Sequence, residues 1–214
     1  MEFLEQNLAN YILTHTSESA ILLQELERET NLKVLMPRMI SGHFQGRVLS
    51  MLSKMIQPKN ILEIGTYTGY SALCLAEGLT PTGQLLTIDI NAELSDLVQK
   101  YFQKSPYKNQ LKYINANAME YLKNLEGFFD IVFIDADKEN YQQYYDMIID
   151  RVVPGGYIIA DNVLWSGKVV AELKKIDKDT QAILDFNAFV QADNRVENVL
   201  FPIRDGLLIA RKNK

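Results

Sequence analysis

Residues 60–71 of this 214-residue chain read Asn-Ile-Leu-Glu-Ile-Gly-Thr-Tyr-Thr-Gly-Tyr-Ser. A short apolar run, a glycine and then a second apolar segment predict a strand, a tight turn and a helix. Gly65 can adopt backbone angles that other residues rarely adopt, and it lets a ligand approach the main chain. Residues 61–64 show no polar face, which is typical of a parallel strand covered by helices on both sides. The stretch therefore predicts the first βα unit of an α/β sheet.

After residue 59, short β-rich segments alternate with amphipathic helical segments. This alternation predicts βαβ units and hence a mostly parallel, doubly wound sheet. Before residue 59, apolar residues recur at helical spacing, which predicts N-terminal helices. The expected strands span residues 60–64, 84–90, 111–115, 130–135, 157–160, 196–203 and 207–211. The expected helices span residues 3–14, 19–29, 42–56, 70–79, 92–104, 119–124, 141–152 and 178–191.

The last two expected strands are joined by Arg204-Asp205-Gly206. Asp-Gly between two apolar runs is typical of a hairpin, so we expect an antiparallel edge at the C-terminal end of the sheet. The length of the chain suits one domain. We therefore predict a single domain over residues 1–214, with a helical extension at 1–58 and the core at 59–214.

The composition disfavours several classes of protein. A net charge of −5 argues against nucleic acid as the main partner, because phosphate binding normally needs a basic patch. A local group of lysines, Lys168, Lys174, Lys175 and Lys178, leaves that alternative open. One cysteine forbids an internal disulfide. Neither a signal peptide nor an apolar run of membrane-spanning length is visible, so we predict a cytoplasmic protein without membrane contact.

An acid ends the expected strand that follows the glycine turn. Asp89 at that strand tip can accept hydrogen bonds from both ribose hydroxyls of a nucleoside. A pyrophosphate cofactor usually requires Gly-x-Gly-x-x-Gly, whereas this turn has Tyr67 at the second glycine position. Glu63, Gly65 and Asp89 together favour a nucleoside ligand without phosphates, such as S-adenosylmethionine, over NAD and over a purely structural turn.

Oxygen-bearing side chains end two further expected strands. Asp135 closes one, and Asp161 with Asn162 closes the next. If the two strands are neighbours, their tips lie roughly 4.8 Å apart and can share one ion. Carboxylate and amide oxygens select Mg²⁺, Ca²⁺ or Mn²⁺ over zinc. A single acid at a strand end more often caps a helix or stays solvated, so the hypothesis depends on the combination.

Lys138 lies three residues after Asp135. A neutral lysine beside a cation site could accept the proton of an acidified hydroxyl. The alternative is a solvated lysine paired with Asp137 or Glu139, and the residues alone leave both open. Trp165, in the loop after the oxygen ligands, is a candidate for stacking on a substrate.

Four segments together resemble the catechol and caffeoyl-coenzyme A type of class I O-methyltransferase, and the small bacterial members in particular. The resemblance covers residues 37–211 in the family's order. It implies a Rossmann-like sheet of seven strands, a homodimer, and methyl transfer from S-adenosylmethionine to a hydroxyl. The segments are residues 62–71, 135–141, 161–167 and 202–206, which read LEIGTYTGYS, DADKENY, DNVLWSG and PIRDG.

The resemblance also implies roles for individual residues. Lys138 would be the base, and Asp135, Asp161 and Asn162 would bind Mg²⁺ or a similar ion. Family members often read Gly-Asp-Ala where residues 116–118 read Ala-Asn-Ala, so an amide replaces a carboxylate beside the adenine. The implied cofactor contacts are Met39 and Ser41 in a closing segment, Glu63 and Gly65 at the methionine part, Ser71 at its carboxylate, Asp89 at the ribose, Asn117 and Ala118 at the adenine, and Asp135.

We therefore predict a divalent-metal-dependent O-methyltransferase whose acceptor is a small, vicinal-dihydroxy aromatic of the catechol or caffeoyl type. The catechol enzymes of animals carry an acid where this chain has Pro202, so animal-like catechol selectivity is not implied. Some bacterial relatives methylate a hydroxylated wobble uridine, which keeps tRNA as an alternative acceptor. A cofactor-binding module without catalysis is the third possibility.

Overall fold

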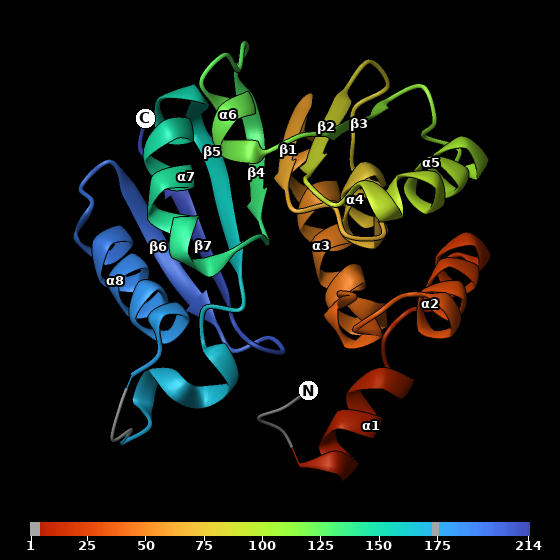
Figure 1. Cartoon of the computed structure of the whole chain (residues 1–214), viewed down its shortest axis with the longest axis horizontal. Helices are drawn as coiled ribbons and strands as arrows, with labels where there is room; N and C mark the ends of the chain where they lie inside the picture. The colour runs from red at the N-terminus through yellow and green to blue at the C-terminus, as the bar shows by residue number, and fades with distance from the viewer. Residues whose placement is uncertain (1–4, 173–175) are drawn as a thin grey trace. The chain divides into compact units, whose positions relative to one another are not determined.

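The computed structural model describes residues 5–172 and 176–214, and these residues form two compact units, 5–118 and 119–214 (Figure 1). No helix among the described residues is long and apolar enough to cross a membrane.

Three parallel strands form the sheet portion of the unit 5–118. They are β1 (Asn60–Ile64), β2 (Gln84–Asp89) and β3 (Leu111–Asn115). Ile64 is in register with Ile88, so the turn after β1 and the acid that ends β2 lie at one edge. The apolar residues of β1 are fully buried, as predicted for a strand covered on both faces.

Helices precede and connect these strands. α4 contacts β2, and α5 contacts β3, while α3 packs along α4. The predicted N-terminal helices are confirmed, although residues 3 and 4 of the first lie outside the described residues. The helices are α1 (Gln6–Thr14), α2 (Ile21–Lys33), η1 (Pro37–Met39), α3 (Gly42–Ile56), α4 (Tyr70–Ala76), η2 (Ala92–Leu94) and α5 (Ser95–Lys104).

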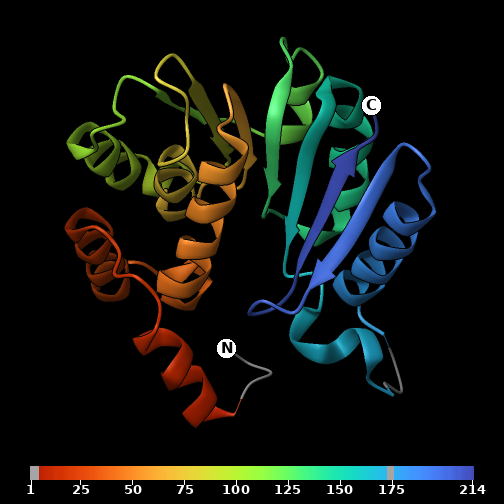
Figure 2. The same ribbon diagram turned by 180° about the vertical axis from the view of Figure 1, so that it is seen from behind.

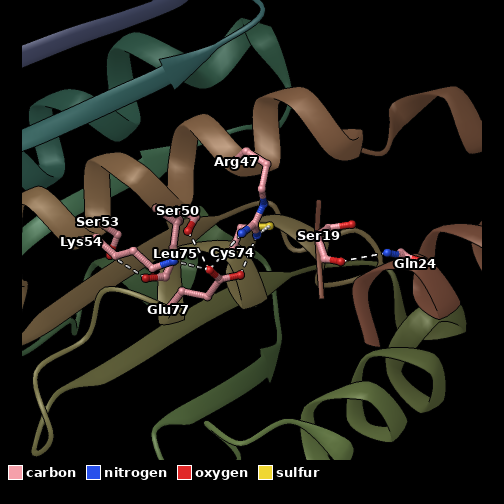
Figure 3. Close-up of polar contacts among 9 residues, drawn as sticks. All are labelled: Ser19, Gln24, Arg47, Ser50, Ser53, Lys54, Cys74, Leu75 and Glu77. Carbon is pink, nitrogen blue, oxygen red and sulfur yellow. Dashed lines mark hydrogen bonds and ion pairs between the residues drawn. The ribbon is translucent and has the colours of Figure 1, made fainter. Parts of the chain in front are cut away.

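α4 ends three residues earlier than its pattern predicts, at a point where the chain meets α3. A Cβ on Gly78 would lie 2.2 Å from the main-chain carbon of Ser53, so only glycine fits there. Glu77, beside it, accepts two hydrogen bonds from Arg47 at 3.0 and 2.6 Å (Figure 3). Burial would raise the pKa of Glu77, but hydrogen bonds from Arg47, Lys54 and Ser50 lower it to about 2. This ionic cluster joins α3 to α4.

Four strands form the sheet portion of the unit 119–214. β4 (Phe129–Ile134) and β5 (Val152–Asp161) are parallel. β7 (Leu207–Lys212) is antiparallel to β5, and β6 (Val196–Phe201) is antiparallel to β7 (Figure 2). The predicted C-terminal hairpin is therefore confirmed.

α6, α7 and α8 lie over one face of the strands of this unit, as the two opposite views show (Figures 1 and 2). α7 and α8 also pack on each other. The helices are α6 (Ala118–Leu122), which begins at the last residue of the first unit, then η3 (Lys138–Asn140), α7 (Tyr141–Ile148), η4 (Ile149–Arg151), η5 (Trp165–Val170) and α8 (Lys178–Ala192).

The prediction was wrong about where β5 begins. The structure starts the strand at Val152, which was assigned to the preceding helix, instead of at residue 157. The register shifts opposite Phe129 and Ile131, so the strand bends within its Pro-Gly-Gly segment. A Cβ on Gly156 would lie 2.9 Å from Val152, which explains why a glycine is needed at the bend.

The strand order is β3-β2-β1-β4-β5-β7-β6. This order confirms the predicted doubly wound, mostly parallel α/β sheet of seven strands with an antiparallel C-terminal hairpin and N-terminal helices.

Candidate functional site

The turn after β1 depends on its two glycines. Gly65 has φ +98° and donates its amide to the Ile88 carbonyl at 2.9 Å. Gly69 has φ +86°, and a Cβ there would lie 2.8 Å from the Phe102 ring. Tyr67, between them, also has a positive φ, of +49°. The backbone angles therefore favour glycine at both positions, and the close approach of Phe102 adds a steric reason at Gly69.

Asp89 holds this turn from the tip of β2. Its Oδ2 accepts the amides of Thr66 and Tyr67 at 2.9 and 2.7 Å, and its Oδ1 accepts the amide of Asn91 at 2.8 Å. A carboxylate has about four acceptor positions, so a further donor could still be accommodated. The chain thus orients this carboxylate before any ligand arrives.

Glu63 is fully buried beneath the turn. The Thr87 hydroxyl donates to Glu63 Oε2, and the Thr66 hydroxyl contacts Thr87. Ser71 is buried in the first turn of α4. These contacts place Glu63, Gly65, Ser71 and Asp89 around one turn, as the sequence predicts.

The segment before α3 is connected to the same turn. The Tyr67 hydroxyl donates to the carbonyls of Leu35 and Met36 at 3.3 and 3.2 Å. Met39 is 58% exposed in this segment, whereas Ser41 is buried.

Asn117 and Ala118 follow β3 at the same edge of this unit's strands, Asn117 exposed and Ala118 half-buried.

In the unit 119–214, a second set of polar side chains lies at the ends of β4 and β5. Ile134 is in register with Ala160, so Asp135 and Asp161 occupy the next positions at the same edge. Asp161 is buried, and its Oδ1 accepts the amide of Asn162 at 2.7 Å. Asn162 has φ +59°, a left-handed angle that is uncommon for residues other than glycine. The predicted neighbourhood of these three residues is thus present.

Lys138 is only 8% exposed and turns toward this edge. Its Nζ lies 3.2 Å from Asp135 Oδ1 and donates a hydrogen bond to the Tyr141 hydroxyl. Tyr141 in turn donates to the main-chain carbonyl of Asp161 at 3.1 Å. The alternative of a solvated lysine paired with Asp137 or Glu139 is wrong, because Lys138 is buried and pairs with Asp135.

Tyr141 is the residue that the sequence analysis missed. Three tyrosines on α7 fit a helix face packing on a sheet, and nothing in that pattern distinguishes the one that reaches Lys138. The available signal was its position three residues after the lysine, which places both side chains on one side of the helical turn.

The loop after Asn162 has a strained backbone. Trp165 and Ser166 have φ +47° and +52°. The loop is held by the Leu164 amide, which donates to the Asp205 carbonyl at 2.8 Å, and by Gly206, where a Cβ would lie 2.6 Å from Leu164. Non-glycine residues in such angles often cluster at functional sites.

Trp165 itself lies close to two lysines. The Nζ atoms of Lys138 and Lys168 each lie 5.8 Å from its ring centroid. Its indole Nε1 is buried and makes no hydrogen bond to the residues that the structure describes.

The donor set at the ends of β4 and β5 suits a hard cation. Two carboxylates and one amide offer oxygen only, which is the preference of Mg²⁺, Ca²⁺ and Mn²⁺. Over residues 5–172 and 176–214, no group of three or more His, Cys, Asp or Glu side chains is arranged to hold a metal. Asp135 and Asp161 supply two such side chains, and the third expected ligand is an asparagine.

Comparison with known proteins is consistent with this arrangement. Residues 13–213 match the sequence model of the O-methyltransferase family. The chain belongs to this family. It is 33% identical over 213 residues to caffeoyl-CoA O-methyltransferase 1 of Eucalyptus globulus, covering 92% of the chain and 87% of that protein. It is 34% identical over 223 residues to caffeoyl-CoA O-methyltransferase of Medicago sativa, covering 97% and 89% respectively.

Solved structures of relatives show the same fold. An O-methyltransferase from Bacillus cereus in complex with SAH has a TM-score of 0.90 and 26% identity, and the match covers 100% of both chains. An SAH-bound methyltransferase from Podospora anserina has a TM-score of 0.88 and 27% identity over 99% of this chain and 97% of that one. The chain is therefore an S-adenosylmethionine-dependent O-methyltransferase with the class I fold, as the four sequence segments predict.

Proposed function

We propose that the enzyme transfers a methyl group from S-adenosylmethionine to one hydroxyl of a small vicinal-dihydroxy aromatic, in a reaction that depends on a divalent cation. The observation that carries the proposal is the edge of β4 and β5, where Asp135, Asp161 and Asn162 follow paired strands and Lys138 lies 3.2 Å from Asp135. The proposed acceptor class also agrees with the names of the caffeoyl-CoA O-methyltransferases to which the chain is similar.

Asp135, Asp161 and Asn162 would hold the cation. When bound, a Mg²⁺ ion would hold two adjacent oxygens of the acceptor and make the attacking hydroxyl more acidic. The burial of Asp161 supports this role, because a carboxylate removed from water gains from a matched positive charge. The left-handed Asn162 also supports it, since local strain is retained where an arrangement of side chains is needed.

Lys138 would act as the general base. Its burial keeps its amine away from bulk water, and its contacts with Asp135 and Tyr141 fix the position of Nζ. The proton of the acceptor hydroxyl passes to Lys138, the oxygen bonds to the methyl carbon, and the carbon–sulfur bond breaks with its electron pair remaining on sulfur. The sulfonium becomes a neutral thioether, so charge and atoms balance.

The turn after β1 would hold the methyl donor. The preoriented carboxylate of Asp89 can accept a hydrogen bond from the ribose, and Gly65 leaves the main chain open to the methionine part, next to Glu63 and Ser71. The remaining assignments follow the family resemblance: Met39 and Ser41 in the closing segment, Asn117 and Ala118 beside the adenine, and Asp135 as a further cofactor contact.

Trp165 would contribute to acceptor binding. Its ring lies 5.8 Å from the Nζ of Lys138, so it flanks the proposed base. A flat indole at this position suits an aromatic acceptor.

The tRNA alternative receives less support. The net charge is −5, and Lys168, one of the four lysines that kept this alternative open, is paired with Asp177 at 2.9 Å. Lys174 and Lys175 lie outside the described residues. A homodimeric assembly, a cytoplasmic location and a single functional domain over residues 1–214 are further parts of our proposal that rest on the sequence and the family resemblance.

An acceptor screen tests the proposal. The full chain is incubated with S-adenosylmethionine carrying a labelled methyl group and with catechols, caffeoyl-CoA or undermethylated tRNA, each with Mg²⁺ and with EDTA. We expect label in the catechols or caffeoyl-CoA with Mg²⁺, and its loss with EDTA. If only tRNA is labelled, the acceptor is tRNA and not a small aromatic. If EDTA does not reduce labelling, the reaction does not depend on a divalent cation.

A further inference from the structure

Tyr141 connects the proposed base, Lys138, to the end of β5 through hydrogen bonds of its hydroxyl. It is fully buried at the start of α7, and its ring packs edge-on against Phe186 of α8, with centroids 5.4 Å apart and planes at 83°. The position of its hydroxyl is therefore set by the packing of the ring.

The direction of each hydrogen bond at this hydroxyl follows from chemistry. The main-chain carbonyl of Asp161, 3.1 Å away, can only accept, so the single proton of Tyr141 points to it. The hydroxyl must then accept from Lys138.

The orientation of the lysine amine follows in turn. A neutral amine has two N–H groups and one free electron pair. Tyr141 takes one N–H, and the Asp135 carboxylate oxygen at 3.2 Å, which also only accepts, takes the other. The free electron pair of Nζ therefore points away from both Tyr141 and Asp135.

We propose that Tyr141 is a positioning residue, whose hydroxyl fixes the Lys138 amine so that its free electron pair faces the acceptor hydroxyl. This inference rests on the proposed function, because it requires Lys138 to be the base. Because Tyr141 is fully buried, it would act on the acceptor through Lys138 and not by direct contact.

The same helix provides a matched control. Tyr145 lies one turn further along α7, and its ring also packs edge-on against Phe186. It is fully buried, and its hydroxyl donates to Asp193 at 2.9 Å. Tyr145→Phe therefore removes one hydrogen-bonding hydroxyl from the same aromatic cluster without changing the surroundings of Lys138.

The experiment compares Tyr141→Phe, Tyr145→Phe and Lys138→Met in the full chain, with caffeoyl-CoA as the acceptor and Mg²⁺ present. We expect Tyr141→Phe to lower kcat about tenfold, a part of the usual contribution of a general base, with both KM values unchanged. Tyr145→Phe should keep kcat within about twofold of the wild type, because it leaves the base in place. Calorimetric titration should give unchanged affinities for S-adenosylmethionine and Mn²⁺ in both tyrosine variants, which separates orientation of the base from damage to either site.

Three outcomes would overturn the inference. Equal kcat in the two tyrosine variants, while Lys138→Met is inactive, removes the role of Tyr141 and leaves the proposed function intact. A raised KM or weakened Mn²⁺ binding in Tyr141→Phe makes the tyrosine a structural support of the cation site. If the wild type shows no Mg²⁺-dependent turnover of caffeoyl-CoA or of any catechol, or Lys138→Met is fully active, the proposed function fails and the role of Tyr141 fails with it.

Discussion

Two clusters of charged side chains in this enzyme have opposite balances of positive and negative charge. At Glu77 one carboxylate receives hydrogen bonds from Arg47, Lys54 and Ser50, so cations outnumber the acid (Figure 3). At the ends of β4 and β5 there are two carboxylates and one lysine, which pairs with Asp135, and the backbone beside them is strained. The first cluster is complete within the chain and serves stability. The second carries excess negative charge, which is the condition for attracting a cation.

The largest effect should come from removing a carboxylate of the second cluster. Asp161→Ala removes a buried proposed ligand and should lower kcat/KM about 10³-fold, since a cation supplies several kcal/mol of stabilisation in the transition state. The assay is labelled-methyl transfer at saturating Mg²⁺, alongside Mn²⁺ titration. Glu77→Gln is the control, and it should leave kcat/KM of the folded enzyme unchanged. An active Asp161→Ala enzyme would show that both clusters are structural.

Lys138→Met should have the next largest effect. The substitution keeps the length of the side chain but removes the base, so we expect kcat to fall about 10²- to 10³-fold. Because the Lys138 side chain no longer contacts Asp135, Mn²⁺ affinity should be equal to or higher than that of the wild type. Weaker Mn²⁺ binding would contradict the role of Lys138 as the base and indicate that this lysine supports the structure at the ends of β4 and β5.

A substitution in the Glu77 cluster should lower the stability of the protein without lowering kcat. Glu77→Gln leaves Arg47, whose side chain is 13% exposed, without its charged partner, and should lower the free energy of unfolding by about 2 kcal/mol. Urea denaturation measures this loss, and kcat of the folded enzyme should not change. A drop in kcat without a loss of stability would reverse our division between the two clusters.

The effect of pH on this cluster has a defined sign. The pKa of Glu77 falls from 4.5 to about 2 in the folded protein, so the ionised form is favoured by folding. Its contribution to stability is fully present above pH 4.5 and is lost as the pH falls toward 2. The difference in unfolding free energy between the wild type and Glu77→Gln should therefore shrink over this range. If the difference in unfolding free energy stays constant down to pH 2, the pKa of Glu77 is not lowered by the cluster in the way described.

The sequence predicted the features that depend on strand ends and parallel register. Asp89, Asp135 and Asp161 were located correctly because a parallel sheet brings such residues to one edge of each unit. The contact of Tyr67 with the carbonyls before α3, and the hydroxyl that joins Lys138 to Asp161, were not predicted. Both depend on how side chains from separate elements pack, which periodicity does not encode.

The start of β5 shows another limit of sequence patterns. Val152 continues the apolar spacing of the preceding helix, so the pattern extends past the helix end at Ile148. The strand begins there because its glycines permit a bend that keeps it paired with β4. Only the pairing partner distinguishes the two conformations, and the pairing is a tertiary property.

The smallest effect should come from Asp89→Asn, which tests the turn after β1. The amide keeps the shape of the side chain but lowers its strength as an acceptor, so the Kd for S-adenosylmethionine should rise about tenfold. Asp193→Asn is the control: its carboxylate accepts hydrogen bonds from Arg195 and Tyr145 and lies outside the turn after β1, so this Kd should not change. Isothermal titration without acceptor or metal measures both. An unchanged Kd in Asp89→Asn would mean that this carboxylate serves only the amides of Thr66, Tyr67 and Asn91, and that the turn resembles the Glu77 cluster in being complete within the chain.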